Sequence, residues 1–242
     1  MITRNPSLTE QVMAHLRERI LAGDFEEGRI PPETELATEL GVSRTTIRDA
    51  FSRLEHQGII TRRQGAGTFV NGPGLQIKSR LEEIWSYDEV LRDHGYTPSV
   101  DLLATTTEPA DSEIAADLGI DEGEPVVVME KLFRENDRPV IHTSNRVAAS
   151  LVDDPDGTGA TLPIFEFLDQ HCGRVLGYYL SEIVPVTLDA RVAGLLDVDP
   201  GTPALCFQEI GFDQDNQAVL SARSVFRDDL LRFRLIRRKA GV

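Results

Sequence analysis

The sequence predicts an α+β protein of two domains. A small helical domain ends in a β-hairpin and is followed by a larger mixed, mostly antiparallel β-sheet domain with helices. Residues 8–57 carry three stretches of helical periodicity. A break rich in glycine and proline follows at residues 71–74, and beyond it one helix and two strands occur twice as an internal repeat. A length of 242 residues with 27% charged residues suits a globular protein of two domains.

The first two helices are predicted from periodicity and end signals. Residues 8–21 place apolar side chains at helical spacing, and Gly23 ends this helix. Ser7 and Thr9 are both suited to cap its start. A second helix, over residues 31–40, opens on a proline pair, where the missing N–H groups cost nothing, and its early glutamates suit the helix dipole.

A third helix is predicted over residues 44–57, directly after a tight turn at residues 41–43. Ser43 caps this helix, and its apolar side chains form a single face. Short polar and basic side chains lie off that face near the N-terminal end: Arg44, Thr45 and Arg48. A helix, a three-residue turn and a second helix with such a leading end suit the major groove of DNA, where arginine can bond a guanine edge bidentately.

A β-hairpin is predicted over residues 59–70. Two short β-type runs flank a turn that contains glycine. Arg62 and Arg63 stand at its base, and small residues form its tip. A hairpin of this kind is typical of a wing that lies along the DNA backbone or in the minor groove.

In this order, the motifs of residues 1–71 resemble the winged helix-turn-helix of the GntR family of bacterial regulators. The matching residues are Gly28 to Ala37, Gly41 to Arg48, Leu54 with Gly58, and Gly65 to Val70. The resemblance implies that this domain binds double-stranded operator DNA. With the two wing arginines included, the expected contact residues are Arg44, Thr45, Thr46, Arg48, Arg62, Arg63, Gln64 and Gly65. Thr34 departs from the pattern, because many relatives carry an arginine there that touches DNA.

The charge of the chain is distributed unevenly. The formal net charge is −15, but residues 1–72 contribute only −1 of it, with nine arginines against ten carboxylates. The acidic second part should therefore discourage non-specific coating of DNA. No apolar run approaches the roughly 20 residues of a membrane span, so no membrane partner is expected. Cys172 and Cys206 lack metal-type spacing and are expected to be reduced thiols of a cytoplasmic protein.

The second part of the chain contains two related copies of one unit. A shift of 78 positions aligns residues 111–125 with 189–203, and six of the aligned residues are identical. One extra residue later, Phe133 pairs with Phe212. Each copy predicts a short helix followed by two strands: 126–133 and 139–147 in the first copy, 204–212 and 218–226 in the second. A helix over 164–171 and a strand over 178–185 are predicted between the copies.

These elements predict one pseudo-symmetric sheet domain, since two copies are too few for a solenoid. The expected organisation is a DNA-binding domain at residues 1–71, a linker at 72–79 and the sheet domain at 80–242.

The sheet domain resembles the effector-binding UTRA domain of the HutC subfamily within GntR, which has a chorismate lyase-like fold. The residues that carry this resemblance are Asp88 to Val90, Gly95, Leu118 with Gly123 to Pro125, Lys131 to Phe133, Pro139, Leu162 with Phe165 to Leu168, Gly211 to Asp213, and Phe226 to Asp229. It implies a small-molecule metabolite effector, a homodimer, and repression that the effector relieves.

The implied effector pocket lies over the sheet between the two halves. Relatives that sense phosphorylated sugars typically have arginine at the positions of Lys131 and Phe133, glutamate at that of Leu220 and tyrosine at that of Phe226. These differences leave the pocket with fewer charged and hydrogen-bonding groups. They lead to the hypothesis of a less anionic or more apolar effector than a sugar phosphate. The candidate pocket residues are Lys131, Phe133, His142, Ser144, Ser181, Glu182, Ser221 and Arg223.

No catalytic motif is found in the sequence. The five histidines show no paired-ligand spacing, and there is no nucleophile elbow or P-loop. The expectation is therefore no enzyme, no metal and no cofactor. Two alternatives remain: a metabolic enzyme of chorismate lyase-like fold with an accessory DNA-binding domain, and an architectural DNA-binding protein that lacks a sensor.

Overall fold

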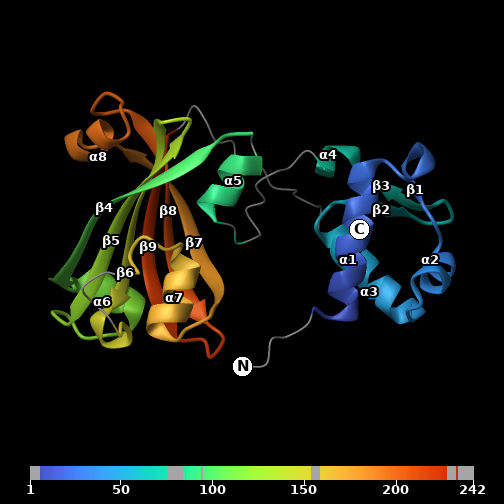
Figure 1. The fold of residues 1–242 in the computed structure, drawn as a ribbon, viewed down its shortest axis with the longest axis horizontal. Coiled ribbons are helices and arrows are strands. Elements are labelled where there is room, and N and C mark those ends of the chain that lie inside the picture. Colours follow the sequence, from blue (N-terminus) through green and yellow to red (C-terminus); the bar gives the residue numbers. More distant parts are fainter. Residues whose placement is uncertain are drawn as a thin grey trace. The chain divides into compact units, whose positions relative to one another are not determined.

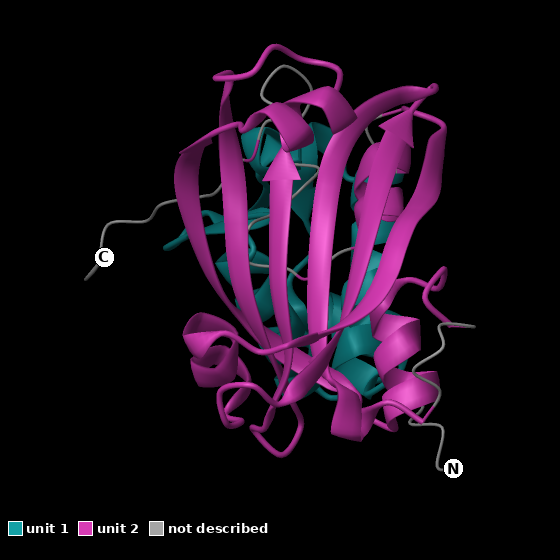
Figure 2. Cartoon of the chain, turned by 90° about the vertical axis from the view of Figure 1, so that its left-hand side faces the viewer, with its two compact units in different colours: residues 1–80, 234–242 teal, residues 81–233 magenta. Residues whose placement is uncertain are grey.

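The structure is a computed structural model that describes residues 6–75, 84, 86–93, 95–153, 159–227 and 233 (Figure 1). These residues fall into two compact units (Figure 2). Unit 1 is described over residues 6–75, and unit 2 over the described residues from 84 onward. Most of the predicted linker, residues 76–79, lies outside the described residues.

The described part of unit 1 contains four α-helices and a small antiparallel sheet of strand order β1-β3-β2. Its elements are α1 (Leu8–Ala22), β1 (Arg29–Ile30), α2 (Glu33–Leu40), α3 (Arg44–His56), β2 (Ile60–Arg63), β3 (Gly67–Val70) and a short α4 (Gly72–Leu75). The three predicted helices and the hairpin are confirmed. Strand β1 was not predicted, because two residues carry no periodicity and become a strand only by pairing with β3.

Local signals set the helix boundaries of unit 1. Ser7 accepts a hydrogen bond from the Glu10 N–H while the Glu10 carboxylate accepts one from the Ser7 N–H, so Ser7 is the cap of α1. Gly23 ends this helix in the left-handed region at φ +77°. Ser43 caps α3 by accepting from the Thr46 N–H at 3.1 Å. The apolar faces of the three helices meet in one core, which includes Leu16, Leu36, Ile47, Phe51 and Leu54.

The predicted break at residues 71–74 is part of unit 1 and ends in a helix. The Asn71 side-chain amide donates to the Gly58 carbonyl at 2.7 Å, and Leu75 packs against the helical core. A Cβ at Gly74 would lie 1.9 Å from the Gly58 carbonyl oxygen, so only glycine allows this approach. The sequence predicted only a break here, whereas a tertiary contact organises residues 72–75 as helix α4.

Unit 2 is built on a six-stranded sheet of order β4-β5-β6-β9-β8-β7. Its strands are β4 (Pro98–Pro109), β5 (Pro125–Glu135), β6 (Arg138–Ala148), β7 (Leu176–Thr187), β8 (Pro203–Asp213) and β9 (Ala218–Phe226). Its helices are α5 (Tyr87–Asp93), α6 (Ser112–Leu118), α7 (Ile164–Cys172) and α8 (Ala190–Leu195). Every described strand pair is antiparallel, where the sequence allowed for a mixed sheet.

The strand order is pseudo-symmetric about the centre of the sheet, as the internal repeat requires. The first copy supplies β4, β5 and β6, the second supplies β7, β8 and β9, and β6 pairs with β9 at the centre. Asp111 and Asp189 cap the corresponding helices α6 and α8 with equal bonds of 2.8 Å. Both copies therefore share the same local construction as well as the same order.

The repeat has one difference from its predicted alignment. Strand β5 has a register shift between Phe133 and Arg134, and β8 has one between Gly211 and Phe212. These positions are again 78 apart, so Phe133 corresponds to Gly211 and not to Phe212. The extra residue of the second copy lies in the turn before β9, where no sequence identity marks it.

The sheet has two distinct faces. Figure 1 shows α5 and α7 on one face, here called the inner face, and α6 and α8 on the other, the outer face. Helix α7 packs on the inner face through Phe167 and Leu168, against Met129 of β5 among others. Helix α8 packs on the outer face against Leu132 and Val225. No helix of the described part of the chain is long and apolar enough to cross a membrane.

Candidate functional site

The leading end of α3 presents polar side chains to solvent. Arg44 and Thr45 are exposed, and Arg44 has no ion pair or hydrogen bond to any described residue. The Thr46 hydroxyl lies 2.8 Å from Ser43 Oγ, so it is part of the helix cap. The Arg48 side chain is 59% exposed, with its Nε 3.4 Å from a Glu33 carboxylate oxygen. The buried side chains of Ile47 and Phe51, on the opposite side of α3, pack in the core of unit 1.

Arg62, on strand β2 of the wing, is held by contacts within unit 1. Its guanidinium lies 3.5 Å from the Glu55 carboxylate and 5.5 Å from the centre of the Phe51 ring, and it donates to the Arg48 carbonyl at 3.2 Å. These contacts connect β2 to α3. Arg62 therefore positions the wing against the helix, a role that the sequence did not predict.

The tip of the wing is exposed, and Arg63 lies there and not at the predicted base, because it pairs with Gly67 next to the turn. Arg63, Gln64 and Gly65 all face solvent, and Gly65 adopts φ +76°, which favours glycine. The Arg63 guanidinium lies 4.9 Å from the Phe69 ring centre, which supports its stem and leaves its donors accessible. Unit 1 thus carries all eight predicted contact residues on α3 and the wing. Their helix N-terminus and guanidiniums suit an anionic duplex.

Unit 2 contains a cavity of about 640 Å³ on the inner face of the sheet. It is lined by α5, by the segment that leads into α7, and by inner-face residues of β4, β5, β6, β7, β8 and β9. The lining combines aromatic walls with placed polar groups, as small-molecule sites do. Its residues include Tyr87, Asp88, Lys131, Phe133, Thr143, Asn145, Leu162, Tyr179, Ser181, Phe207, Glu209 and Ser224.

Three of the eight predicted effector residues line this cavity, namely Lys131, Phe133 and Ser181. The expectation of one common pocket needs correction, because the other five lie outside it: His142, Ser144, Glu182, Ser221 and Arg223. The reason is strand alternation. Lys131 is paired with Thr143, and Thr143 with Ser224, so neighbouring residues such as His142 and Arg223 face the outer side.

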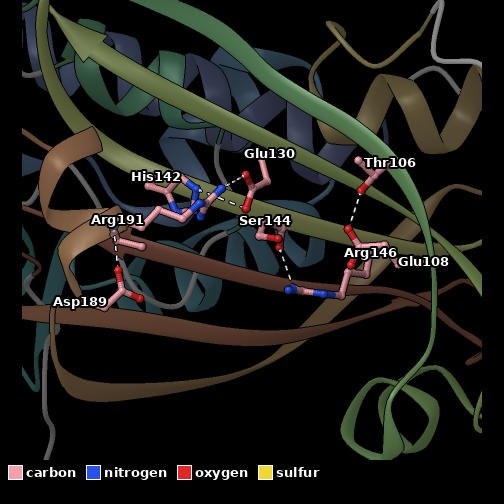
Figure 3. A network of polar contacts seen from close by, with 9 residues as sticks. Thr106, Glu108, Glu130, His142, Ser144, Arg146, Asp189 and Arg191 are labelled. Atoms are coloured by element: carbon pink, nitrogen blue, oxygen red, sulfur yellow. Dashed lines mark hydrogen bonds and ion pairs between the residues drawn. The ribbon is translucent and has the colours of Figure 1, made fainter.

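The outer-face residues take part in polar contacts of their own (Figure 3). Glu130 binds Arg191 of α8, and its other oxygen lies 3.8 Å from His142 Nε2. The Ser221 hydroxyl donates to Asp117 of α6 at 2.7 Å. Burial lowers the pKa of His142, an effect that Glu130 opposes. These residues connect the sheet to α6 and α8.

Lys131 is a buried cation of the cavity, with 3% of the residue exposed. Its ammonium donates to the Leu162 carbonyl, just before α7. Burial lowers the pKa of Lys131 to about 8, and the Asp88 carboxylate opposes that shift.

Glu209 is the main cavity residue that the sequence analysis missed. It accepts a hydrogen bond from the Ser181 hydroxyl at 2.6 Å. Burial raises the pKa of Glu209, and the bond from Ser181 opposes that rise. The internal repeat could have identified this residue, because Glu209 lies 78 positions after Lys131 and so occupies the corresponding position in the second copy. Thr143 and Asn145 would have been predicted as cavity residues if the inward-facing positions of β6 had been assigned correctly.

Among the described residues, the cavity lining has one lysine and two carboxylates, and it contains no histidine and no cysteine. No group of three metal-ligating side chains occurs in the described part of the chain. The arrangement is suited to holding a small molecule through charge, hydrogen bonds and ring contacts.

Two family descriptions match this chain. Residues 8–70 match "Bacterial regulatory proteins, gntR family", and residues 93–232 match "UTRA domain". The first match coincides with the helices and wing of unit 1, and the second with the sheet of unit 2.

Curated relatives are similar over almost the whole chain. The transcriptional repressor NagR of Bacillus subtilis is 26% identical over 224 residues, 92% of this chain and 91% of the relative. The repressor MngR of the mannosyl-D-glycerate transport/metabolism system in Escherichia coli is 26% identical over 230 residues, 95% of each chain. The regulator Rv0792c of Mycobacterium tuberculosis is 30% identical over 194 residues, 78% of this chain and 70% of the relative.

Solved structures agree with the fold. The crystal structure of PhnF from Mycobacterium smegmatis is 28% identical, covers 94% of this chain and 99% of its own, and gives a TM-score of 0.61. The possible regulator YydK from Bacillus subtilis matches the fold with a TM-score of 0.77 at 17% identity, over 96% of this chain and 100% of its own. The chain therefore belongs to the GntR family of bacterial regulatory proteins, as a DNA-binding transcriptional regulator with a UTRA effector domain.

Proposed function

We propose that this regulator is a repressor that binds a palindromic operator as a homodimer and is released by a small metabolite bound in the cavity of unit 2. The observation that carries the proposal is the combination of an accessible basic surface in unit 1 with a lined cavity in unit 2. The relatives NagR and MngR, both named repressors, support the sign of regulation. Two-fold symmetry of the protein would be matched by a palindromic site.

In this proposal the leading end of α3 reads the major groove. Arg44 has its guanidinium free of described partners, and Arg48 can exchange its exposed ion pair with Glu33 for a base edge or phosphate. Thr45 is exposed beside them, while Thr46 supports the helix cap. The wing supplies Arg63, with Gln64 and Gly65 allowing close approach to the backbone.

We propose a binding role for the cavity and no catalytic role. Its described lining residues include no histidine and no cysteine, and no group of three metal-ligating side chains occurs among the described residues. Because the operator is chromosomal DNA, we place the protein in the cytoplasm.

The test is fluorescence anisotropy with DNA upstream of the regulator's own gene and its neighbours. The full-length protein is titrated in parallel with the Arg44→Ala/Arg48→Ala variant and with Arg53→Ala, which removes an exposed arginine at the far end of α3. We expect sequence-specific binding that the double variant loses and Arg53→Ala retains. The mass of the complex in solution reports whether two chains bind one site.

Equal, weak binding of natural and scrambled DNA would contradict the proposed operator function, provided that a genome-wide selection of bound fragments also returns no shared site. A complex with one chain per operator would contradict the homodimer alone. Tighter operator binding on addition of the effector would contradict release and leave DNA recognition intact.

A further inference from the structure

The two halves of the sheet place opposite charges in the cavity. Lys131 on β5 and Glu209 on β8 are at corresponding positions, since the offset of 78 holds through both strands and their register shifts. Both residues line the cavity. One half of the pseudo-symmetric sheet therefore offers an ammonium, and the other half offers a carboxylate.

The Lys131 ammonium already has partners without a ligand. The Lys131 ammonium already donates to the Leu162 carbonyl, and Asp88 is the charged group that acts on it. One oxygen of Asp88 lies 3.3 Å from the Arg92 guanidinium, and its buried Oδ1 has no hydrogen-bond partner among the described residues. An added anion would therefore compete with the Leu162 carbonyl and Asp88 for this ammonium.

Glu209, in the other half, has no basic partner among the described residues. Glu209 accepts a bond from the Ser181 hydroxyl, but no described basic side chain forms an ion pair with it. Tyr87, Tyr179 and Phe207 line the same cavity, and the charge of Glu209 raises the pKa of both tyrosines in addition to the larger effect of their burial. A carboxylate in a cavity lined by aromatic residues can attract a cation through its own charge and through the π-systems of the rings.

Between Lys131 and Glu209, the central strands β6 and β9 add polar groups to the cavity, and Thr143 is the direct neighbour of Lys131. Thr143 is 2% exposed and lines the cavity, yet its hydroxyl has no hydrogen-bond partner among the described residues. The Asn145 amide and the Ser224 hydroxyl share this face. A buried hydroxyl without a partner costs free energy, which a ligand that bonds to it would recover.

We propose that the effector is an organic amine, whose protonated nitrogen pairs with Glu209 between the aromatic walls of the cavity. This inference rests on the proposed function, because it takes the cavity of unit 2 as the effector site. It excludes sugar phosphates, whose doubly charged group would face Asp88 and Glu209 with only Lys131 to receive it among the described lining residues.

The test uses four probes of known charge and calorimetric titration of the full-length protein. Phenethylamine, 2-phenylethanol and 3-phenylpropionate share a ring on a short chain but are cationic, neutral and anionic, and glucose 6-phosphate represents the sugar phosphates. We expect phenethylamine to bind most tightly and Glu209→Gln to weaken it at least about tenfold. The matched control is Glu182→Gln, which removes the same charge from exposed β7 outside the cavity and should leave the affinity unchanged.

The pH dependence gives a second readout. Phenethylamine needs the ionised form of Glu209, whose pKa burial raises, so its affinity should fall as the pH is lowered through that pKa. Glu209→Gln should abolish this dependence. Absence of phenethylamine binding, tighter binding of 3-phenylpropionate or glucose 6-phosphate, or an equal loss in Glu182→Gln would each overturn the amine site.

Operator release, followed by anisotropy with the same probes, separates this inference from the proposed function. Binding of phenethylamine at Glu209 without any change in operator affinity would refute the effector role and leave the amine site standing. Release by glucose 6-phosphate in both the wild type and Glu209→Gln would refute the amine site and leave the proposed function standing.

Discussion

Unit 1 and unit 2 place their functional charges in opposite environments. In unit 1 the arginines of α3 and the wing are exposed, and apolar side chains form the core behind them. In unit 2 Lys131 is buried in a cavity, where its pKa is lowered to about 8. A surface charge can be changed with little effect on folding, whereas a buried charge is coupled to stability and to pH. The two sites should therefore fail in different ways when they are mutated.

The largest expected effect comes from the core of unit 1. Phe51→Ala removes a ring that is 1% exposed and should lower the free energy of unfolding of this unit by about 3–5 kcal/mol. Operator binding should be lost, while unit 2 keeps its own thermal transition in calorimetry. Phe167→Ala is the matched change in the core of unit 2. If Phe51→Ala shifted both transitions equally, the independence of the two cores would be refuted.

The next effect concerns an exposed arginine. Arg44→Ala should weaken operator binding by about 1–3 kcal/mol, which is a factor of roughly 5 to 150, because a guanine-edge or phosphate contact is lost. The melting temperature should stay unchanged, since Arg44 has no described partner to lose. Anisotropy and differential scanning fluorimetry measure the two quantities. A large drop in melting temperature would show that Arg44 supports the fold and would undo the contrast with unit 2.

A third effect tests the buried charge through pH. The pKa of Lys131 is lowered from 10.5 to about 8, so between these values the unfolded chain binds the proton that the folded chain has released. The free energy of unfolding should therefore rise with pH across this window, by on the order of 1–3 kcal/mol relative to Lys131→Met. Urea unfolding of both proteins from pH 7 to pH 10 measures it. Parallel pH profiles would contradict burial of a charged lysine.

The smallest effect distinguishes two neighbouring arginines of the wing. Arg62→Met breaks the contacts with Glu55 and the Arg48 carbonyl and should cost about 1 kcal/mol of stability. Arg63→Met should change stability by less than about 0.5 kcal/mol, because its support is an exposed ring contact. Both variants should bind the operator more weakly. Equal stability of the two would contradict the positioning role of Arg62.

The sequence was sufficient for most of unit 1 because its signals are local. Ser7, Ser43 and Gly23 mark helix ends within a few residues of the helices they bound. The polar leading end of α3 is contiguous in sequence, so its candidate residues could be named together. Strand β1 and helix α4 were missed because pairing with β3 and the approach of Gly74 to Gly58 create them.

The cavity of unit 2 depended on register, which is not a local property. The positions of strands β5 to β9 were predicted correctly. The predicted alternation of β6 and β9 was wrong by one residue, so the candidate residues chosen on these strands lie on the outer face. Strand β4 was not predicted at all. It lies at the edge of the sheet, and buried and exposed side chains do not alternate clearly along it. The sequence therefore shows no regular alternation of apolar and polar residues there.

The matched positions of Lys131 and Glu209 have a further consequence. A cavity framed by two equivalent halves would, with identical side chains, accept a molecule in either of two orientations. The pair of unlike charges gives this cavity an electrical direction, so a bound molecule has a head and a tail. Because each residue occupies the other's place in the repeat, exchanging them would reverse that direction on an otherwise unaltered scaffold. The orientation of a bound molecule in this domain is thus determined by two side chains, while the pseudo-symmetric shape of the cavity is determined by the backbone.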